Sequence, residues 1–188
     1  MRKLIVFNNI SLDGCFTDAN GDMSWAHRSD AEFDDFTAGN ARQNAVMVFG
    51  RVTYELMMRF WPTQQAMQTY PDVARSMNES EKIVFSSTLA RASWKNTRVL
   101  SGDVVKHMRS LKAQAGPDLL IMGSGTLVAP LTEGGLVDEF QLVLCPLVLG
   151  AGRTLFEGVT KRPVMNCLQS RTFSNGNVFL RYAPAGWS

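Results

Sequence analysis

Short apolar runs alternate with polar, helix-like stretches along the first two thirds of the chain. The stretches between the runs carry apolar residues at helical spacing, as at Val104, Met108 and Leu111. Short runs rich in β-branched residues are typical of buried strands, and their alternation with helices predicts a mostly parallel sheet. The predicted strands cover residues 4–10, 45–49, 82–85, 98–100, 119–122 and 140–145.

Local signals place several helix ends. Ser29 and Glu32 form a capping box, which predicts a helix that begins at Ser29. Pro71 suits the first turn of a helix through residue 77, and Asp103 is a typical N-cap residue for the next helix. Further helices are expected over residues 53–60 and from the glycine segment at 123–126 to about residue 133. Residues 13–24 are predicted to form a polar loop.

The last third of the chain changes pattern. Asn175 and Gly176 form a strong hairpin turn signal between two alternating segments. The prediction is therefore an α/β fold with a mixed, mostly parallel central sheet and a C-terminal antiparallel hairpin.

Composition restricts the class of protein. The 188 residues fit one domain, 1–188, and the net charge of +2 comes from scattered Lys and Arg, so no nucleic-acid partner is expected. No apolar run approaches the roughly 20 residues that span a membrane, and the apolar run at residues 4–7 is too short for a secretion signal. We therefore expect a cytoplasmic protein.

Cysteine and histidine usage narrows the chemistry further. The three cysteines lack the spacing of metal ligands, and we interpret them as packing residues in a reducing compartment. They are Cys15, Cys145 and Cys167. Only His27 and His107 are present, so neither a histidine metal site nor a Ser-His-Asp triad is expected. Any chemistry should come mainly from a bound group.

Three predicted strands end in residues suited to phosphate. Glycine lets a backbone approach a ligand closely, and the following helix offers free N–H groups and a positive dipole end. Arg51 would add a fork of charged donors. Together these strand ends could hold a dinucleotide beyond the carboxyl ends of the sheet. They are Gly50-Arg51-Val52-Thr53, Ser86-Ser87-Thr88 and Gly123-Ser124-Gly125-Thr126.

Each segment also has a plainer interpretation. Glycine after a strand is common turn chemistry, Ser86-Ser87 can be an ordinary loop, and Arg51 can be a solvated charge. Neither a G-x-G-x-x-G fingerprint nor a Walker A sequence occurs. From the residues alone, a site for an anionic nucleotide is one interpretation of these segments. The residues alone do not indicate a reaction.

The same segments resemble dihydrofolate reductases. Residues 48–55 are similar to the cofactor-binding G-R-x-T-[YW]-E segment of that family, residues 83–88 to its strand ending in serine, and residues 120–127 to its glycine segment. Residues 10–14, 21–25, 135–139 and 146–150 are similar to the reductase domain of the bifunctional riboflavin-biosynthesis deaminase-reductase. The resemblance spans roughly residues 3–183 and implies a dihydrofolate reductase-like three-layer fold that uses NADPH.

The resemblance also implies roles for individual residues. The cofactor phosphates would contact Gly50, Arg51 and Thr53, and the adenosine 2′-phosphate would lie near Ser86 and Ser87. The pyrophosphate would be lined by Gly123, Ser124, Gly125, Thr126 and Leu127. Asp13 and Trp25 would flank the nicotinamide and the substrate, together with Asp30 and Phe33.

Two departures concern the substrate. Riboflavin reductases usually carry a glutamate just before the glycines, where this chain has Met122. The deaminase motifs H-x-E and P-C-x-x-C are absent, which excludes base deamination for this chain. Trp25 and Asp30, in contrast, have the tryptophan–acid spacing of dihydrofolate reductases.

Asp30 has two interpretations. As a catalytic proton donor packed against Trp25, Phe33 and Phe36, it would have a raised pKa. As an acid in the first helical turn, it would be structural, and a water would deliver the proton.

The expected activity is hydride transfer from NADPH to a pterin-like or ribosylaminopyrimidine-like substrate, as in 5-amino-6-(5-phosphoribosylamino)uracil reduction. The alternatives are dihydrofolate reductase activity, a catalytically silent nucleotide-binding homologue, and a dimeric scaffold with an empty pocket. Residues 135–156 resemble the dimer-forming part of the riboflavin reductases, so a homodimer is expected; the alternative is a central strand covered by the chain's own helices.

Overall fold

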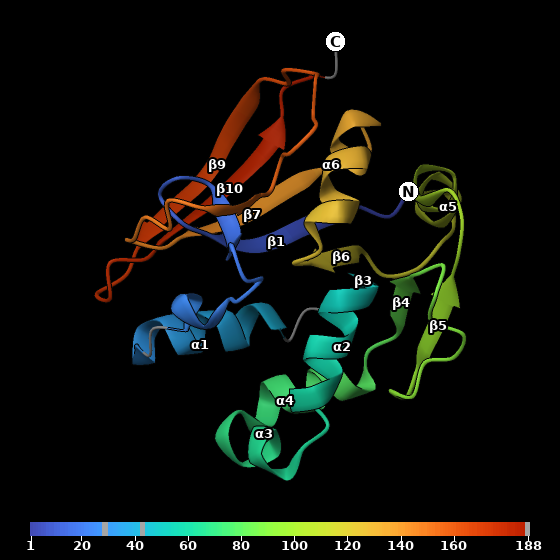
Figure 1. Cartoon of the computed structure of the whole chain (residues 1–188), viewed down its shortest axis with the longest axis horizontal. Coiled ribbons are helices and arrows are strands. Elements are labelled where there is room, and N and C mark those ends of the chain that lie inside the picture. The colour runs from blue at the N-terminus through green and yellow to red at the C-terminus, as the bar shows by residue number, and fades with distance from the viewer. Residues whose placement is uncertain (28–29, 42–43, 187–188) are drawn as a thin grey trace.

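A computed structural model describes residues 1–27, 30–41 and 44–186. Within these ranges, one eight-stranded sheet has the order β5-β4-β3-β6-β1-β7-β10-β9 (Figure 1). The six strands from β5 to β7 are mutually parallel, and the β9–β10 hairpin adds antiparallel to β7. Their bounds are β1 Leu4–Ile10, β3 Val46–Gly50, β4 Lys82–Phe85, β5 Thr97–Leu100, β6 Leu119–Met122, β7 Glu139–Leu144, β9 Met165–Thr172 and β10 Val178–Pro184.

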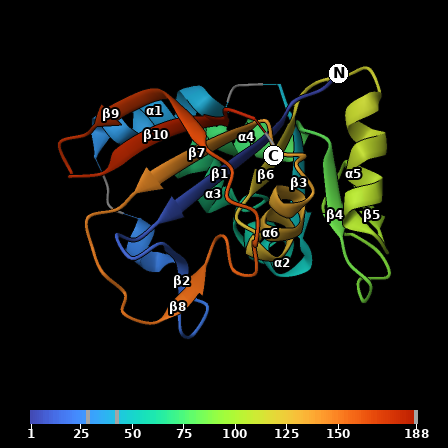
Figure 2. The same cartoon turned by 90° about the horizontal axis from the view of Figure 1, so that it is seen from above.

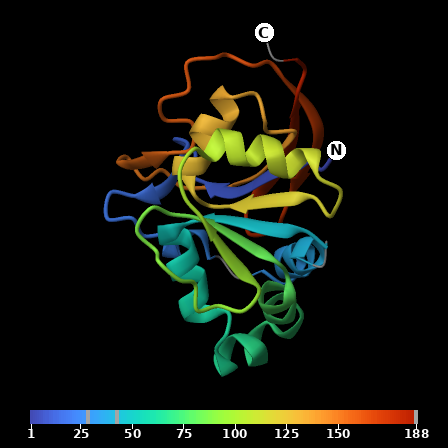
Figure 3. The same ribbon diagram turned by 90° about the vertical axis from the view of Figure 1, so that its right-hand side faces the viewer.

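Helices cover both faces of the sheet, which makes three layers (Figures 1 and 3). One layer consists of α5 (Val104–Ala113) and α6 (Gly125–Glu133). The opposite layer contains α1 (Ala31–Ala41), α2 (Arg51–Phe60), α3 (Gln64–Thr69) and α4 (Pro71–Glu79).

Strand alternation explains how each face is filled. On β1, Leu4 and Val6 point into the core cluster beneath α5 and α6, whereas Phe7 packs with the α1 cluster. Both faces of the parallel strands are thus apolar, as expected for strands buried between two helical layers. The carboxyl ends of β1, β3, β4 and β6 consequently meet at one edge of the sheet, where α2 and α6 begin.

The predicted α/β class, the mostly parallel sheet and the hairpin at Asn175–Gly176 are confirmed. Asp103 caps α5, because its side chain accepts a hydrogen bond of 3.0 Å from the Lys106 amide. The predicted Ser29 capping box lies outside the described residues. Helix α2 begins at Arg51 rather than residue 53, since the strand β3 passes directly into it.

Several elements were not predicted. Residues 13–24 contain β2 (Cys15–Asp18), which pairs with β8 (Gly152–Thr154) in a separate two-stranded sheet (Figure 2). A short 3-10 helix, η1, follows at Ser24–Ala26, and α3 is a further unpredicted helix. The expectation of a polar loop over residues 13–24 was therefore wrong for residues 15–18, because they pair with a distant segment.

The cysteine prediction holds for two of three positions. Cys15 and Cys145 are buried in the core, as expected of packing residues. Cys167 is exposed, and its expected packing role was wrong. It lies on β9, the last strand of the sheet, where most side chains reach solvent.

No helix within residues 1–27, 30–41 and 44–186 is both long and apolar enough to cross a membrane.

Lys82 is a fully buried lysine at the start of β4. Its ammonium group donates to the carbonyls of Asn78, Ser80 and Lys95 at 3.2, 2.7 and 3.3 Å. It also lies 4.6 Å from the ring centre of Trp94. Loss of hydration lowers the pKa of Lys82 to about 8. Lys82 thus connects the end of α4 to the sheet, although burying its charge is unfavourable.

This burial predicts an alkaline rise in stability. Between pH 8 and 10.5, the unfolded chain retains a proton on Lys82 that the folded chain has released, so the free energy of unfolding should increase with pH, by roughly 1–2 kcal/mol. Urea denaturation at pH 7.5 and 10 measures this change. Lys82→Met should flatten the rise, whereas Lys106→Met, at an exposed lysine, should leave it intact. Equal rises in both variants would contradict the assignment.

Candidate functional site

The ends of β3 and β6 are joined by a chain of hydrogen bonds. The Gly50 amide donates to the Ser124 hydroxyl at 2.9 Å, and this hydroxyl donates to Thr53 Oγ1 at 2.9 Å. Ser124 is buried, with only 6% of its surface exposed. The sequence separation of 74 residues between Gly50 and Ser124 is closed by the adjacent pairing of β3 and β6. Two of the three predicted phosphate segments therefore form a single structure.

The glycine segment has an unusual backbone. Gly123 and Ser124 have φ values of +64° and +58°, a left-handed conformation that L side chains rarely adopt. A Cβ on Gly123 would also come within 3.2 Å of the Thr53 methyl group. Strained non-glycine residues persist where the surrounding structure holds them, and they cluster at ligand sites. The turn places the first amides of α6, at Gly125 and Thr126, at the edge where β3 ends.

Asn8 fixes the glycine segment to the central strand. Its side-chain amide donates to the Gly123 carbonyl at 3.3 Å, and the Gly123 amide bonds to the Phe7 carbonyl at the same distance. The sequence analysis did not identify Asn8 as a site residue. A buried polar residue inside an otherwise apolar strand was the signal that could have identified it.

Phe16 supports the same segment from outside the main sheet. It is buried on β2 and packs directly against Gly125, where a Cβ would fall 2.5 Å from Cζ of the ring. Only glycine permits this approach. The first turn of α6 is thus held between β3 on one side and β2 on the other.

Arg51 and the serine segment lie at the neighbouring strand ends. Gly50 on β3 pairs in register with Phe85 on β4, so Arg51 and Ser86 follow adjacent parallel strands. Arg51 is exposed, and its guanidinium bonds to Glu55 one turn along α2 at 2.9 and 3.0 Å. Ser86 accepts hydrogen bonds from the amides of Thr88 and Leu89, and Ser87 is exposed.

Leu127 differs from its neighbours in the glycine segment. Its side chain is buried in the core beneath α6, and its amide donates to the Ser124 carbonyl at 2.8 Å. The residue therefore offers neither an exposed side chain nor an unbonded amide at this edge. Thr126, in contrast, is exposed beside Gly50.

The remaining predicted residues fall into two places. Trp25 and Phe33 pack in one aromatic cluster with Phe173, and the rings of Phe33 and Phe173 meet edge to face at 5.1 Å. Asp13 instead accepts bonds from the Leu149 and Gly150 amides at 3.2 and 2.8 Å.

Asp13 and its hydrogen bonds connect the β1–β2 turn to the turn at residues 149–150. Hydrogen bonds from Ser11 and from these two amides lower the pKa of Asp13 to about 2. The carboxylate is therefore ionised at neutral pH and holds two distant turns together.

Asp30 directly precedes α1, and its side chain caps that helix. One carboxylate oxygen accepts from the Phe33 amide at 2.9 Å, and the other accepts from the Ser174 hydroxyl. These bonds, chiefly that from Ser174, lower the pKa of Asp30. The expected rise in its pKa was wrong, because hydrogen-bond donors rather than apolar rings face the carboxylate. Its part in a reaction remains a prediction.

Asp30→Ala and Asp30→Asn separate the two roles. Asparagine caps a helix as well as aspartate, so we expect Asp30→Asn to keep most of the melting temperature and Asp30→Ala to lower it. Because the pKa of Asp30 is lowered in the folded protein, its ionised carboxylate stabilises the fold above about pH 4, and this stabilisation is lost as the pH falls. The difference in melting temperature between Asp30→Ala and the wild type should therefore shrink in acid. Thermal melts between pH 7 and pH 2.5 measure this. A deficit that is constant with pH would exclude the ionised cap.

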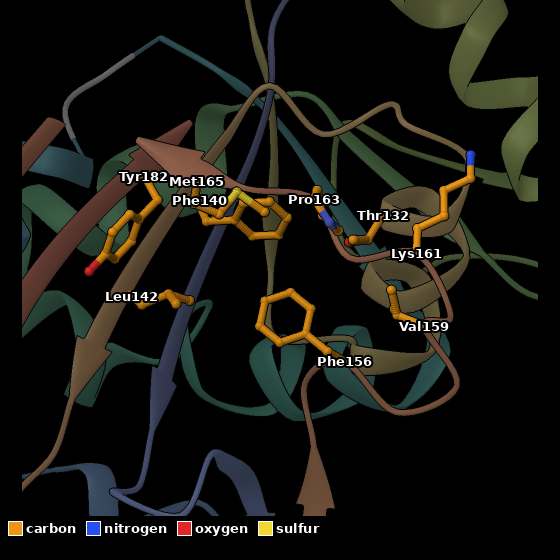
Figure 4. Close-up of a pocket in the computed structure, with 9 residues that line it drawn as sticks. All are labelled: Thr132, Phe140, Leu142, Phe156, Val159, Lys161, Pro163, Met165 and Tyr182. Carbon is orange, nitrogen blue, oxygen red and sulfur yellow. The ribbon is translucent and has the colours of Figure 1, made fainter. Parts of the chain in front are cut away.

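A pocket lies away from this edge, between α6, the sheet and residues 156–163 (Figure 4). Its volume is about 350 Å³. It is lined mostly by apolar side chains from β7, β9, β10 and the connecting segment, including Phe140, Phe156 and Tyr182. None of the predicted site residues contributes to it.

The three-layer arrangement and the glycine segment define a class, the dihydrofolate reductase-like fold. A dihydrofolate reductase from Enterococcus faecalis, in a structure with NADP(H), superposes with a TM-score of 0.66 at 12% identity, over 98% of this chain and 97% of that one. A protein of Shewanella sp. PV-4, assigned by name to riboflavin biosynthesis, gives a TM-score of 0.73 at 22% identity, over 98% and 99% of the two chains.

The family is more specific than the fold. Residues 2–179 match the family model of the RibD C-terminal domain, and this chain belongs to that family. The protein YyaP of Bacillus subtilis (strain 168), itself uncharacterised, is 30% identical over 183 residues, which cover 96% of this chain and 94% of YyaP. The resemblance in the sequence to riboflavin-pathway reductases and to dihydrofolate reductases is thereby confirmed.

Proposed function

We propose that this chain is an NADPH-dependent reductase that transfers a hydride to a pterin-like or ribosylaminopyrimidine-like substrate, as in 5-amino-6-(5-phosphoribosylamino)uracil reduction. The observation that carries the proposal is the Gly50–Ser124–Thr53 hydrogen-bond chain, which joins two strand ends at the start of two helices. Membership of the RibD C-terminal domain family supports it.

The residues at this edge suit a dinucleotide with phosphate groups. Gly123 leaves open a space beside Thr53 that a Cβ would fill, and Thr126 and Gly125 stand at the first turn of α6. The positive end of the helix and its N–H groups favour a phosphate there. Arg51 and Ser86, on the neighbouring strand ends, suit a second phosphate such as the adenosine 2′-phosphate.

Reduced nicotinamide, when bound, supplies the hydride. The contribution of the chain is orientation and the exclusion of water. The Asn8 side chain and the Ser124 hydroxyl hold the glycine segment against β1 and β3. Trp25 and Phe33 provide an apolar wall on the α1 side. Because Asp30 is held ionised by Ser174, a water delivers the proton in this proposal.

The test combines binding with turnover. NADPH should raise the melting temperature of the protein, and its absorbance should fall when ribosylaminopyrimidines, pterins or dihydrofolate are added. Preferential oxidation with dihydrofolate would instead support the dihydrofolate reductase alternative. No effect of millimolar NADPH on melting would refute the cofactor assignment.

A catalytically silent nucleotide-binding homologue is the second candidate. Two observations favour it: Met122 stands where riboflavin reductases carry a glutamate, and Asp30 is engaged in capping α1. This function predicts NADPH binding without oxidation across the whole substrate panel. A cytoplasmic location belongs to both candidates and agrees with the interpretation of the cysteines as packing residues in a reducing compartment.

A homodimer is also part of the proposal. The region 135–156 supplies Phe140, Leu142 and Phe156 to the apolar pocket, which Figure 4 shows, and the rings of Phe140 and Phe156 meet edge to face at 5.5 Å. Phe156 is 41% exposed, and Val164 and Leu168 are 70% and 51% exposed. Large exposed apolar side chains are typical of protein interfaces.

Light scattering after size exclusion should therefore give about twice the chain mass of 20.8 kDa. Phe156→Lys should reduce the measured mass toward that of one chain, whereas Val52→Lys, at an exposed apolar residue on α2, should not. A wild-type mass of one chain would refute the dimer.

A further inference from the structure

Carboxamide atoms without a hydrogen-bond partner occur at the end of β1 and just before the start of β10. Among the described residues, seven buried side-chain N or O atoms lack a hydrogen-bond partner. Four of these atoms belong to Asn8, Asn9 and Asn177. β1 and β10 flank β7, and β1 ends and the antiparallel β10 begins at the carboxyl end of β7. Buried polar atoms without partners cost about 1–3 kcal/mol each, so a concentration of them requires an explanation.

The three asparagines differ in the face that they occupy. Asn8 shares its face with Val6 and donates to the Gly123 carbonyl. Asn9 points to the opposite face, with Phe7, and pairs in register with Val143. Phe7 and Val143 both pack in the cluster that contains Trp25 and Phe33. The Asn9 carboxamide therefore lies on the α1 side, beside aromatic rings.

Exposure separates Asn9 from the other two. Asn8 and Asn177 are 2% and 0% exposed. Asn9 is partly exposed, although its Oδ1 is shielded and has no partner. Turning the amide about χ2 would exchange Oδ1 with Nδ2, so either end of the group can face the site. Asn9 is thus the asparagine that a small molecule can reach.

We propose that Asn9 is a specificity-determining residue that hydrogen-bonds the lactam edge of a planar heterocycle. The ring would bind on the α1 side of β1, between the Trp25–Phe33 cluster and the glycine segment. The proposal rests on the proposed function for its substrate and deepens it. A carboxamide presents an acceptor and donors side by side, which is complementary to the adjacent N–H and C=O groups of a pyrimidinedione or a pterin.

The charge of the residue adds selectivity. Asn9 is neutral, and the acid on the same side, Asp30, is held by Phe33 and Ser174. A neutral amide favours an uncharged ring over a protonated one. A ring that lacks the N–H leaves the carboxamide oxygen of Asn9 without a partner, which lowers the affinity for that ring. Asn9 should therefore discriminate between a lactam and its N-methylated form.

The experiment compares binding of 5,6-diaminouracil and of its N3-methyl derivative to the full chain saturated with NADPH, by calorimetry. We expect the wild type to prefer the unmethylated ring at least tenfold. Asn9→Ala should reduce this preference to less than threefold and leave the affinity for NADPH within twofold. Asn177→Ala is the matched control, because it removes a buried carboxamide at the same end of the sheet, across β7 from Asn9, and it should keep the preference.

The outcomes separate this proposal from the proposed function. A preference unchanged in Asn9→Ala, or a wild type that binds neither ring, overturns the role of Asn9. 5,6-Diaminouracil carries no ribosylamino group to accept a hydride, so turnover is measured separately with the ribosylaminopyrimidines, pterins and dihydrofolate. The expected binding preference without NADPH oxidation on any of those compounds supports Asn9 and refutes the reductase. Should Asn9→Ala fail to fold, Asn9→Ser, whose side chain is too short to reach the ring, should show the same loss of preference.

Discussion

Gly125→Ala is expected to abolish NADPH binding and to lower the free energy of unfolding by about 1–3 kcal/mol, the usual cost of overpacking a well-packed core. The added Cβ would lie 2.5 Å from Cζ of Phe16, closer than real side chains approach. Phe16 is only 5% exposed and packs in the main core, so its ring has little room to move. The first turn of α6 must shift instead.

That shift is what affects the ligand. Ser124, immediately before Gly125, bonds to the Gly50 amide and to Thr53 at 2.9 Å each. Moving the start of α6 lengthens both bonds and separates the two strand ends that suit the phosphates. Urea denaturation gives the stability, and a fluorescence titration gives the affinity for NADPH.

The control uses a glycine with free space. A Cβ on Gly39, within α1, meets nothing within 4 Å, so Gly39→Ala should stabilise the protein by about 0.5–1 kcal/mol through helix propensity. Combining Gly125→Ala with Phe16→Leu should recover part of the lost NADPH affinity. A Gly125→Ala variant that binds NADPH like the wild type would show that the glycine segment lies outside the cofactor site.

The contact between Phe16 and Gly125 illustrates what the sequence could not predict. Gly125 was identified because a glycine segment follows an apolar strand, which is a local pattern. Phe16 was not, because β2 is four residues long and acquires its structure from pairing with β8, more than 130 residues later. The parallel strands were predictable because burial on two faces leaves a continuous apolar run that needs no knowledge of its partner.

Asp30 shows the same limit at the level of chemistry. Its position after Trp25 is a sequence pattern, but its pKa depends on Ser174, which lies 144 residues away and is brought close by the β9–β10 hairpin. The pattern therefore located an acid and predicted the wrong direction of its pKa shift. Gly50, Thr53 and Ser124 were predicted correctly as neighbours because parallel strands must end at one edge.

Arg51→Ala is expected to weaken NADPH binding by about 10–100-fold and NADH binding by less than threefold. Arg51 is the first residue of α2, and its partner in the structure is Glu55, one turn along the same helix. Exposed pairs of this kind contribute little, so the guanidinium can turn to a phosphate without a large loss. A charged hydrogen bond to a phosphate contributes about 1.5–3 kcal/mol, which corresponds to the expected change in affinity.

Two variants distinguish a phosphate contact from a general charge effect. Arg51→Lys keeps the charge and loses the two-pronged geometry, so NADPH affinity should fall to an intermediate value. Glu55→Gln removes the competing carboxylate and should tighten NADPH binding about two- to threefold at low salt. Because NADPH and NADH differ only in the 2′-phosphate, their affinity ratio isolates the contact. If Arg51→Ala weakens both cofactors equally, the residue acts through the helix or the pyrophosphate, and the 2′-phosphate must bind elsewhere along the ends of β3 and β4.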